Sequence, residues 1–301
     1  MEQFVQQLLN GLTVGSGYAL VALGYTMVYG VLKLINFAHG DLFMLGAYLA
    51  LSTTLTLLAA GVATPWVVVL AAFAASMSLV GLTGVFIERT AYRPLRRATR
   101  LAPVVSALGA AVVIQNGVML AYGANYQVFP EGLVAVGGWR VAGMTIPLFR
   151  VAMLVVSLCL MGILYLFVQR TTVGAAIRAV SLDHDTARLM GIDVDRIIML
   201  VFLIGPALGA AAGIMIGLYY RQIHFTMGWV YGLKAFTAAI LGGIGNIPGA
   251  MVGGMILGLL ETLAAGYISS AWKDAFAFLL LIAILVVRPT GLLGERVAEK
   301  L

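Results

Sequence analysis

Two ionisable side chains stand in an otherwise apolar stretch near the start of the chain. His39 and Asp41 follow Asn36 in the sequence VLKLINFAHGDLFMLGAYLA. An Asp at the centre of a membrane helix costs about 2.5 to 3.5 kcal/mol on insertion scales, so it requires a compensating partner or role. Two interpretations stay open. The turn lies beside a path for a solute, or His39 or Asp41 holds the turn by hydrogen bonds or lies in the cytoplasmic headgroup zone near Lys33.

A second set of helix-breaking residues interrupts the sequence GLKAFTAAILGGIGNIPGAMVGG in the other half of the chain. Its members are Gly242, Gly243, Gly245, Asn246 and Pro248. Interrupted membrane helices expose backbone donors and acceptors, which only protein or water can satisfy. Because the two interruptions occupy corresponding positions in the two halves, they indicate a possible internal repeat with a translocation path at its interface. The first segment contributes the path candidates Asn36, Phe37, His39, Gly40 and Asp41.

A polar segment, QRTTVGAAIRAVSLDHDTARLMGIDVDRI, separates two apolar stretches at residues 169–197. Its middle, from Val173 to Met190, is expected to form one short helix with a turn at Gly191. Its small residues and alternating charges, which include Asp183, predict that this helix has a flat, polar face. The segment is either a surface helix that docks a partner or a solvated helix without one.

Enzyme chemistry finds little support in the sequence. A metal site needs three or more ligands, and of the three histidines His184 and His224 are expected on opposite membrane faces, with no Cys partner. A nucleophile context such as GxSxG is absent. The four lysines are followed by Leu, Ala, Asp and Leu, so the chain has no phosphate-binding GxxxxGK[ST] loop. Catalysis by this chain and a bound cofactor are therefore not expected.

The composition defines the elements that must position these residues. Hydrophobic residues make up 62% of the 301 residues, charged residues 10%, and the mean hydropathy is +1.03. A soluble domain has about 25% charged residues, so the chain is expected to lie in membrane lipid. Continuous apolar runs predict an all-α polytopic bundle of about eight transmembrane helices. They are expected at 8–32, 42–60, 65–87, 101–122, 147–169, 197–219, 235–265 with an interruption, and 275–287. The single cysteine, Cys159, lies in such a run and is expected in the core.

The distribution of cations predicts the orientation of the bundle. Three arginine-rich segments, at 88–100, at 170–196 and from Arg288 onward, together with Lys33 contain 13 of the 18 Lys and Arg residues. Cytoplasmic loops carry an excess of these residues, so the three segments are placed in the cytoplasm. The other five are Arg140, Arg150, Arg221, Lys234 and Lys273. Because the cations lie between spans, the net charge of +6 does not indicate a nucleic-acid partner.

Four segments together resemble one known family. The sequences INFAHGDLFMLGAY (35–48), KAFTAAILGGIGNIPGAM (234–251) and RPTGLLG (288–294) are similar to the LivH-type permeases of ABC importers for branched-chain amino acids. The polar segment resembles the coupling loop of these permeases, at about 170–196. Its matching positions are Gly174, Arg178, Ala179, Ala187 and Gly191.

The resemblance implies a single permease domain over residues 1–301 in the bacterial inner membrane. It implies a second, LivM-like permease, two cytoplasmic ATPase subunits that bind ATP and Mg, and a periplasmic substrate-binding protein. The solute would be a branched-chain or other small hydrophobic amino acid. Urea or short amides, which related permeases carry, remain an alternative. A secondary carrier driven by an ion gradient, with Asp41 and Glu261 as ion sites, is the competing class.

Overall fold

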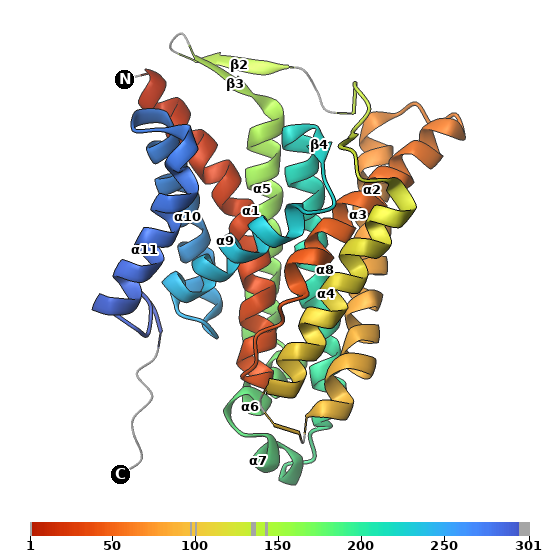
Figure 1. Ribbon diagram of the computed structural model, residues 1–301, viewed down its shortest axis with the longest axis vertical. Coiled ribbons are helices and arrows are strands. Elements are labelled where there is room, and N and C mark those ends of the chain that lie inside the picture. The colour runs from red at the N-terminus through yellow and green to blue at the C-terminus, as the bar shows by residue number, and fades with distance from the viewer. Residues whose placement is uncertain (1, 97, 100, 134–136, 142–143, 295–301) are drawn as a thin grey trace.

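A computed structural model describes residues 2–96, 98–99, 101–133, 137–141 and 144–294 (Figure 1). Four cations of the topology argument, Arg97, Arg100, Arg296 and Lys300, lie outside these residues.

Eight helices of the described part are long and apolar enough to cross a membrane, which confirms the predicted all-α bundle. They are α1 (Glu2–Leu32), α2 (His39–Ala59), α3 (Pro65–Ile87), α4 (Leu101–Tyr122), α5 (Leu148–Arg170), α8 (Val194–Tyr220), α10 (Ile247–Tyr267) and α11 (Lys273–Val287). A π-helical turn, η1 (Glu88–Tyr92), and a 3-10 turn, η2 (Arg93–Leu95), continue α3. Another 3-10 turn, η3 (Ser270–Trp272), precedes α11. Six of the apolar runs thus locate their spans to within about three residues, because each must match the thickness of the bilayer core. The helix α1 begins six residues before the predicted position 8.

The predicted interrupted span at 235–265 consists of two helices. A shorter helix, α9 (Met227–Gly242), runs obliquely through the bundle, and α10 returns from its end (Figure 1). Gly243 and Gly245 between them have φ values of 107° and 95°, which lie outside the helical range and favour glycine. We refer to α9 as the oblique helix.

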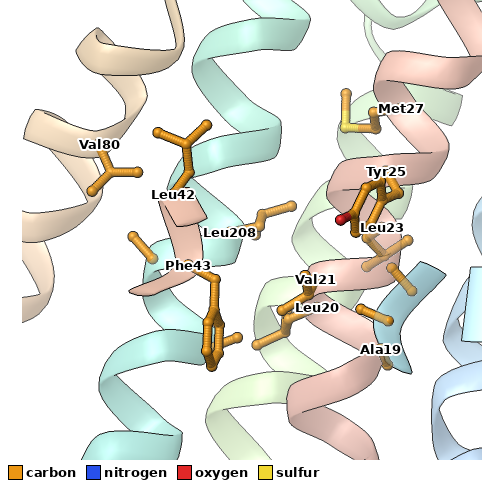
Figure 2. Close-up of a cluster of buried hydrophobic side chains, with 14 of the residues drawn as sticks. Ala19, Leu20, Val21, Leu23, Tyr25, Met27, Leu42, Phe43, Val80 and Leu208 are labelled. Atoms are coloured by element: carbon orange, nitrogen blue, oxygen red, sulfur yellow. The ribbon is translucent and has the colours of Figure 1, made fainter. Parts of the chain in front are cut away.

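The helix α1 is the centre of the bundle. It packs against α10, α8, α9 and α5, whereas α4 and α11 lie at the periphery. Between α1 and α10 the contact is made by small residues, since a Cβ on Gly15 would lie 2.9 Å from the carbonyl oxygen of Gly254. Small residues let membrane helices approach closely where lipid supplies no hydrophobic drive. The apolar core also includes α2, α3 and α8, and Figure 2 shows Leu42 and Phe43 of α2 between Val80 and the side chains of α1.

Two antiparallel strand pairs lie at one end of the bundle, which we call the strand end. β1 (Gln127–Val128) pairs with β4 (Gln222–Ile223), in the register Gln127 opposite Ile223. β2 (Gly138–Val141) pairs with β3 (Met144–Pro147), in the register Gly138 opposite Pro147. The opposite end carries residues 88–96 and two short helices, α6 (Thr172–Leu182) and α7 (His184–Leu189). We call it the arginine-rich end (Figure 1).

The single helix predicted from Val173 to Met190 is wrong, because the segment forms α6 and α7. Asp183 separates them in an extended conformation, with φ −156° and ψ 122°. Its side chain accepts a hydrogen bond of 2.7 Å from the backbone N–H of Thr186. Asp at this position satisfies a free N–H of the first turn of α7, so the cap replaces a continuous helix.

Candidate functional site

The turn between α1 and α2 is fastened by Asn36. Its Oδ1 accepts hydrogen bonds of 3.1 Å from the backbone N–H of Ala38 and from the hydroxyl of Tyr92 in η1. Lys33, which opens the turn, has a φ of 55°. Asn36 thus holds the turn, whereas the second interpretation gave this role to His39 or Asp41. The neighbouring Phe37 is half-buried against the apolar core.

His39 lies at the first position of α2 and is fully buried. Its ring lies beside two glycines. A Cβ on Gly24 of α1 would overlap the ring, and a Cβ on Gly209 of α8 would lie 3.4 Å from Nε2. The ring of Tyr25 packs edge-on against it at 4.7 Å. Neither ring nitrogen has a hydrogen-bond partner among the described residues. Helices therefore surround His39, and its position relative to the headgroup zone stays a prediction.

Asp41 faces the start of the oblique helix α9. A Cβ on Gly228 would lie 2.8 Å from its Oδ1, and Gly40 beside it contacts the backbone of Gly228 and Gly232. The residue is 5% exposed, and Oδ1 has no hydrogen-bond partner in the described part of the chain. Its place in the first turn of α2 favours a negative charge through the helix dipole. An unsatisfied buried carboxylate is costly in a native fold and calls for an explanation.

The two predicted path segments lie at opposite ends of α9. Gly40 and Asp41 contact its first two turns, whereas the second set begins at its last residue, Gly242. A helix of 16 residues is about 24 Å long. The oblique helix therefore connects the two interruptions.

The chain's last described residues cover the second interruption. Gly242 and Gly243 are buried, Gly245 and Pro248 are exposed, and Asn246 is half-buried. Leu292 and Leu293 donate backbone hydrogen bonds of 2.8 and 2.9 Å to the carbonyls of Leu241 and Gly242. The side chain of Asn246 donates to Leu293 O at 2.8 Å and accepts from the N–H of Gly249 at 2.9 Å, which caps α10. The freed backbone groups are thus satisfied within the protein, as a membrane interior requires.

A buried charge cluster, which the sequence analysis missed, joins α9 to its neighbours. Lys234 was grouped with cations between the spans, but its side chain lies inside the bundle and is 4% exposed. Its Nζ is 2.7 Å from Oε1 of Glu261 and 2.7 Å from Oδ1 of Asp274. The hydroxyl of Tyr18 donates to the other oxygen of Glu261 at 2.8 Å. A carboxylate held in this way is poorly suited to be the exchangeable ion site that the carrier hypothesis requires.

Most of the predicted coupling residues hold the shape of the loop. A Cβ on Gly174 would overlap the backbone of Val168, and the guanidinium of Arg178 donates to the carbonyl of Val168. Ala187 is buried and Ala179 is half-buried. Gly191 has a φ of 82°, so the predicted turn there is confirmed. Gly174, Arg178 and Ala187 thus contact the protein and fix α6 and α7 against it, whereas Gly191 is exposed.

The free surface of α6 and α7 differs from the predicted polar face. Leu182, Leu189 and Met190 are 86%, 87% and 78% exposed, and we call them the apolar tip. They share the surface with Asp185 and Arg188, which form an ion pair of 3.3 Å. Large apolar side chains this exposed beyond the spanning helices are candidates for a surface that a partner covers. Sequence periodicity gave no signal, because the kink at Asp183 sets their directions.

Ion pairs join the other end of this loop to the α3–α4 connection. Asp195, in the first turn of α8, contacts Arg93 at 2.8 Å and Arg96 at 2.5 Å. Arg96 also pairs with Glu88, which is buried in η1. The segment 170–196 is therefore attached to the bundle at both of its ends.

Known proteins agree with this architecture. A family model described as branched-chain amino acid transport system, permease component, matches residues 7–285. The chain belongs to this family. It is a multi-pass membrane permease component of a transport system, and it is not itself an enzyme.

The similarity to curated relatives spans the whole chain. This chain is 43% identical over 300 residues to the high-affinity branched-chain amino acid transport system permease protein LivH of Escherichia coli K12. The alignment covers 99% of this chain and 97% of the relative. It is 45% identical over 300 residues to the permease protein BraD of Pseudomonas aeruginosa PAO1, covering 99% and 98%. Such transport systems contain several subunits, so this permease has partner subunits.

A solved structure supports the fold at greater distance. It is described as an inward-facing conformation of an ABC transporter assigned to the metal-chelate type. The TM-score is 0.53 at 17% identity, with 94% of this chain and 87% of the other covered. In this chain, the described residues hold no group of three or more His, Cys, Asp and Glu side chains that could bind a metal ion.

Proposed function

We propose that this permease carries branched-chain or other small hydrophobic amino acids inward, as one half of an ATP-driven importer. Full-length identities of 43–45% to two permeases named for that solute class support the assignment. The other half would be a second, LivM-like permease. Two cytoplasmic ATPase subunits would bind ATP and Mg, and a periplasmic binding protein would deliver the solute.

The exposure of the apolar tip is the observation that best supports a contact between this permease and an ATPase subunit. Leu182, Leu189 and Met190 project from the arginine-rich end, which the positive-inside rule places in the cytoplasm. A cleft on an ATPase subunit would cover them, so that the segment 170–196 acts as a coupling loop. Its predicted residues, from Gly174 to Gly191, would hold the tip in the orientation that docking needs.

The oblique helix α9 and the polar turn before it are the proposed translocation elements. Asp41, next to Gly228 of α9, and His39, between Gly24 of α1 and Gly209 of α8, carry polar atoms without partners among the described residues. Movement of α9 against Gly40 would open these atoms to the path. The set from Gly242 to Pro248 would act as the flexible end of the same element. A conformational switch of this kind needs differential binding of ATP and solute to its states.

The test uses the tagged chain, purified in mild detergent with its partner subunits and reconstituted with the binding protein. Uptake of labelled leucine should require ATP, and unlabelled valine or isoleucine should compete where urea and acetamide do not. Leu189→Asp should release the ATPase subunits, while Leu189→Met, which keeps an apolar side chain of similar size, should retain them. If urea alone competed, the solute would instead belong to the class of urea and short amides. Transport by the isolated chain on an ion gradient would replace the proposal with the carrier.

A further inference from the structure

His184, at the first position of α7, contacts the end of the central helix α1. Its Nε2 lies 2.7 Å from the carbonyl oxygen of Val31. A carbonyl oxygen can only accept, so Nε2 carries the hydrogen and donates it. The residues are 153 positions apart in the sequence, and the contact is partly buried.

The accepting carbonyl belongs to the last turn of α1, which ends at Leu32. Carbonyls of the last turn have no N–H four residues ahead within the helix, and they need a partner from outside. A histidine donor also suits the negative end of the helix dipole. The contact is therefore a side-chain cap that the coupling loop supplies to the central helix.

Beyond this cap, the chain leads directly to the proposed path. Lys33 opens the turn, Asn36 fastens it to Tyr92, and His39 begins α2. A displacement of the end of α1 thus acts on the turn that carries the unpaired polar atoms. Figure 1 shows α6 and α7 below the end of α1, and α2 beginning above it within the bundle.

We propose that His184 is a positioning residue that transmits movement of α6 and α7 to α1 and the α1–α2 turn. The proposal rests on the proposed function of the loop in ATPase docking. Buried Ile177 and Val180 of α6, which packs against α1, resist compression. The hydrogen bond of His184 to Val31 resists separation of α7 from α1. The loop can therefore pull α1 as well as push it.

Two variants separate the hydrogen bond from the volume of the side chain. His184→Leu keeps an apolar group of comparable size without a donor, and His184→Gln keeps a donor at the end of a flexible chain. Both are assayed in the reconstituted complex for ATPase association, basal ATP hydrolysis and stimulation by the loaded binding protein. His184→Leu should retain association and basal hydrolysis but lose about fivefold in stimulation, the factor for a typical hydrogen bond. His184→Gln should restore most of it.

The outcomes distinguish this inference from the function on which it rests. Full stimulation in His184→Leu, with ATPase release in Leu189→Asp, would overturn the role of His184 and leave the docking proposal standing. Equal loss in the Leu and Gln variants would also overturn it, because a donor would then be insufficient. Retained ATPase association and stimulation in Leu189→Asp would overturn docking by the apolar tip, and the inference with it.

Discussion

Lys234 and Glu261 form an ion pair of 2.7 Å inside the bundle, and each is the only charged residue of its helix. Asp274 of α11 is a second partner of the same ammonium group. Buried ions keep their charge only when partners compensate for the lost hydration. The cluster therefore fixes the oblique helix to both helices that follow it.

We expect Lys234→Met to destabilise the protein strongly. The substitution leaves the carboxylate of Glu261 buried without its main partner, and breaking a buried pair in this way costs about 3–5 kcal/mol. The effect is measured as the midpoint temperature of thermal unfolding in detergent, with size-exclusion chromatography used to monitor the folded fraction. The double variant Lys234→Met with Glu261→Gln should recover part of the loss, because no charge is left unpaired. A single variant as stable as the unmodified protein would contradict the assigned pairing.

The contact between α2 and α9 predicts that Gly228→Ala is harmful. A Cβ there would lie 2.7 Å from the carbonyl oxygen of Gly40 and 2.9 Å from the Cα of Asp41, so the backbones would have to separate. Overpacking of this kind costs about 1–3 kcal/mol. Uptake and thermal stability should both fall. Gly117→Ala in α4 is the matched control, because nothing lies within 4 Å of the added carbon. Equal behaviour of the two variants would show that α2 and α9 do not meet closely.

The cap at Asp183 predicts a pH dependence of loop order. The backbone N–H of Thr186 donates to this carboxylate and lowers its pKa below the ordinary value. A depressed pKa means that the cap contributes stability at neutral pH and loses it as the pH falls through the folded pKa. Amide hydrogen exchange of Thr186–Leu189, measured relative to the intrinsic rate of each amide at the same pH, should therefore accelerate in acid. Asp183→Ala should accelerate it at neutral pH as well, whereas Asp183→Asn, which also caps, should not. Unchanged exchange in the Ala variant would remove the cap's role.

Membrane-impermeant thiol labelling tests the orientation of the bundle. Cys159 is exposed on α5, so the experiment begins from Cys159→Ser. A cysteine placed at Ala98, at the arginine-rich end, should react only from the cytoplasmic side. One placed at Gly138, at the strand end, should react only from the periplasm. The reverse pattern would invert the scheme and move the coupling loop away from any cytoplasmic ATPase.

The spans were predictable because the bilayer imposes length and apolarity on every crossing. The break before Ile247 and the turn at Gly191 follow equally from local chemistry. The start of α2 at His39, three residues before the predicted start at 42, has no side-chain cap that the sequence could have indicated. The partner of Lys234 was not predictable, since it depends on the angle at which α9 crosses α10. The exposure of Cys159 escaped prediction for a related reason. An entirely apolar helix carries no pattern that distinguishes its lipid face from its core face.

The apolar tip and the contact of His184 with Val31 depend on the kink at Asp183, which turns α7 away from the direction of α6. A continuous helix would have sent Leu189 and His184 in other directions. The spacing of residues in the sequence predicts the faces of one helix at a time. The directions of these side chains depend instead on the angle between α6 and α7. The candidate path residues were identified by type, but their connection through α9 required the folded chain.

The hydrogen bonds from Leu292 and Leu293 to the end of α9 also constrain the order of biosynthesis. Leu241 and Gly242 are made about fifty residues before the donors that satisfy their carbonyls. The oblique helix therefore waits, incompletely capped, until α11 has left the ribosome and entered the membrane. A chain released before residue 292 would lack the two donors that satisfy the carbonyls at the end of the oblique helix.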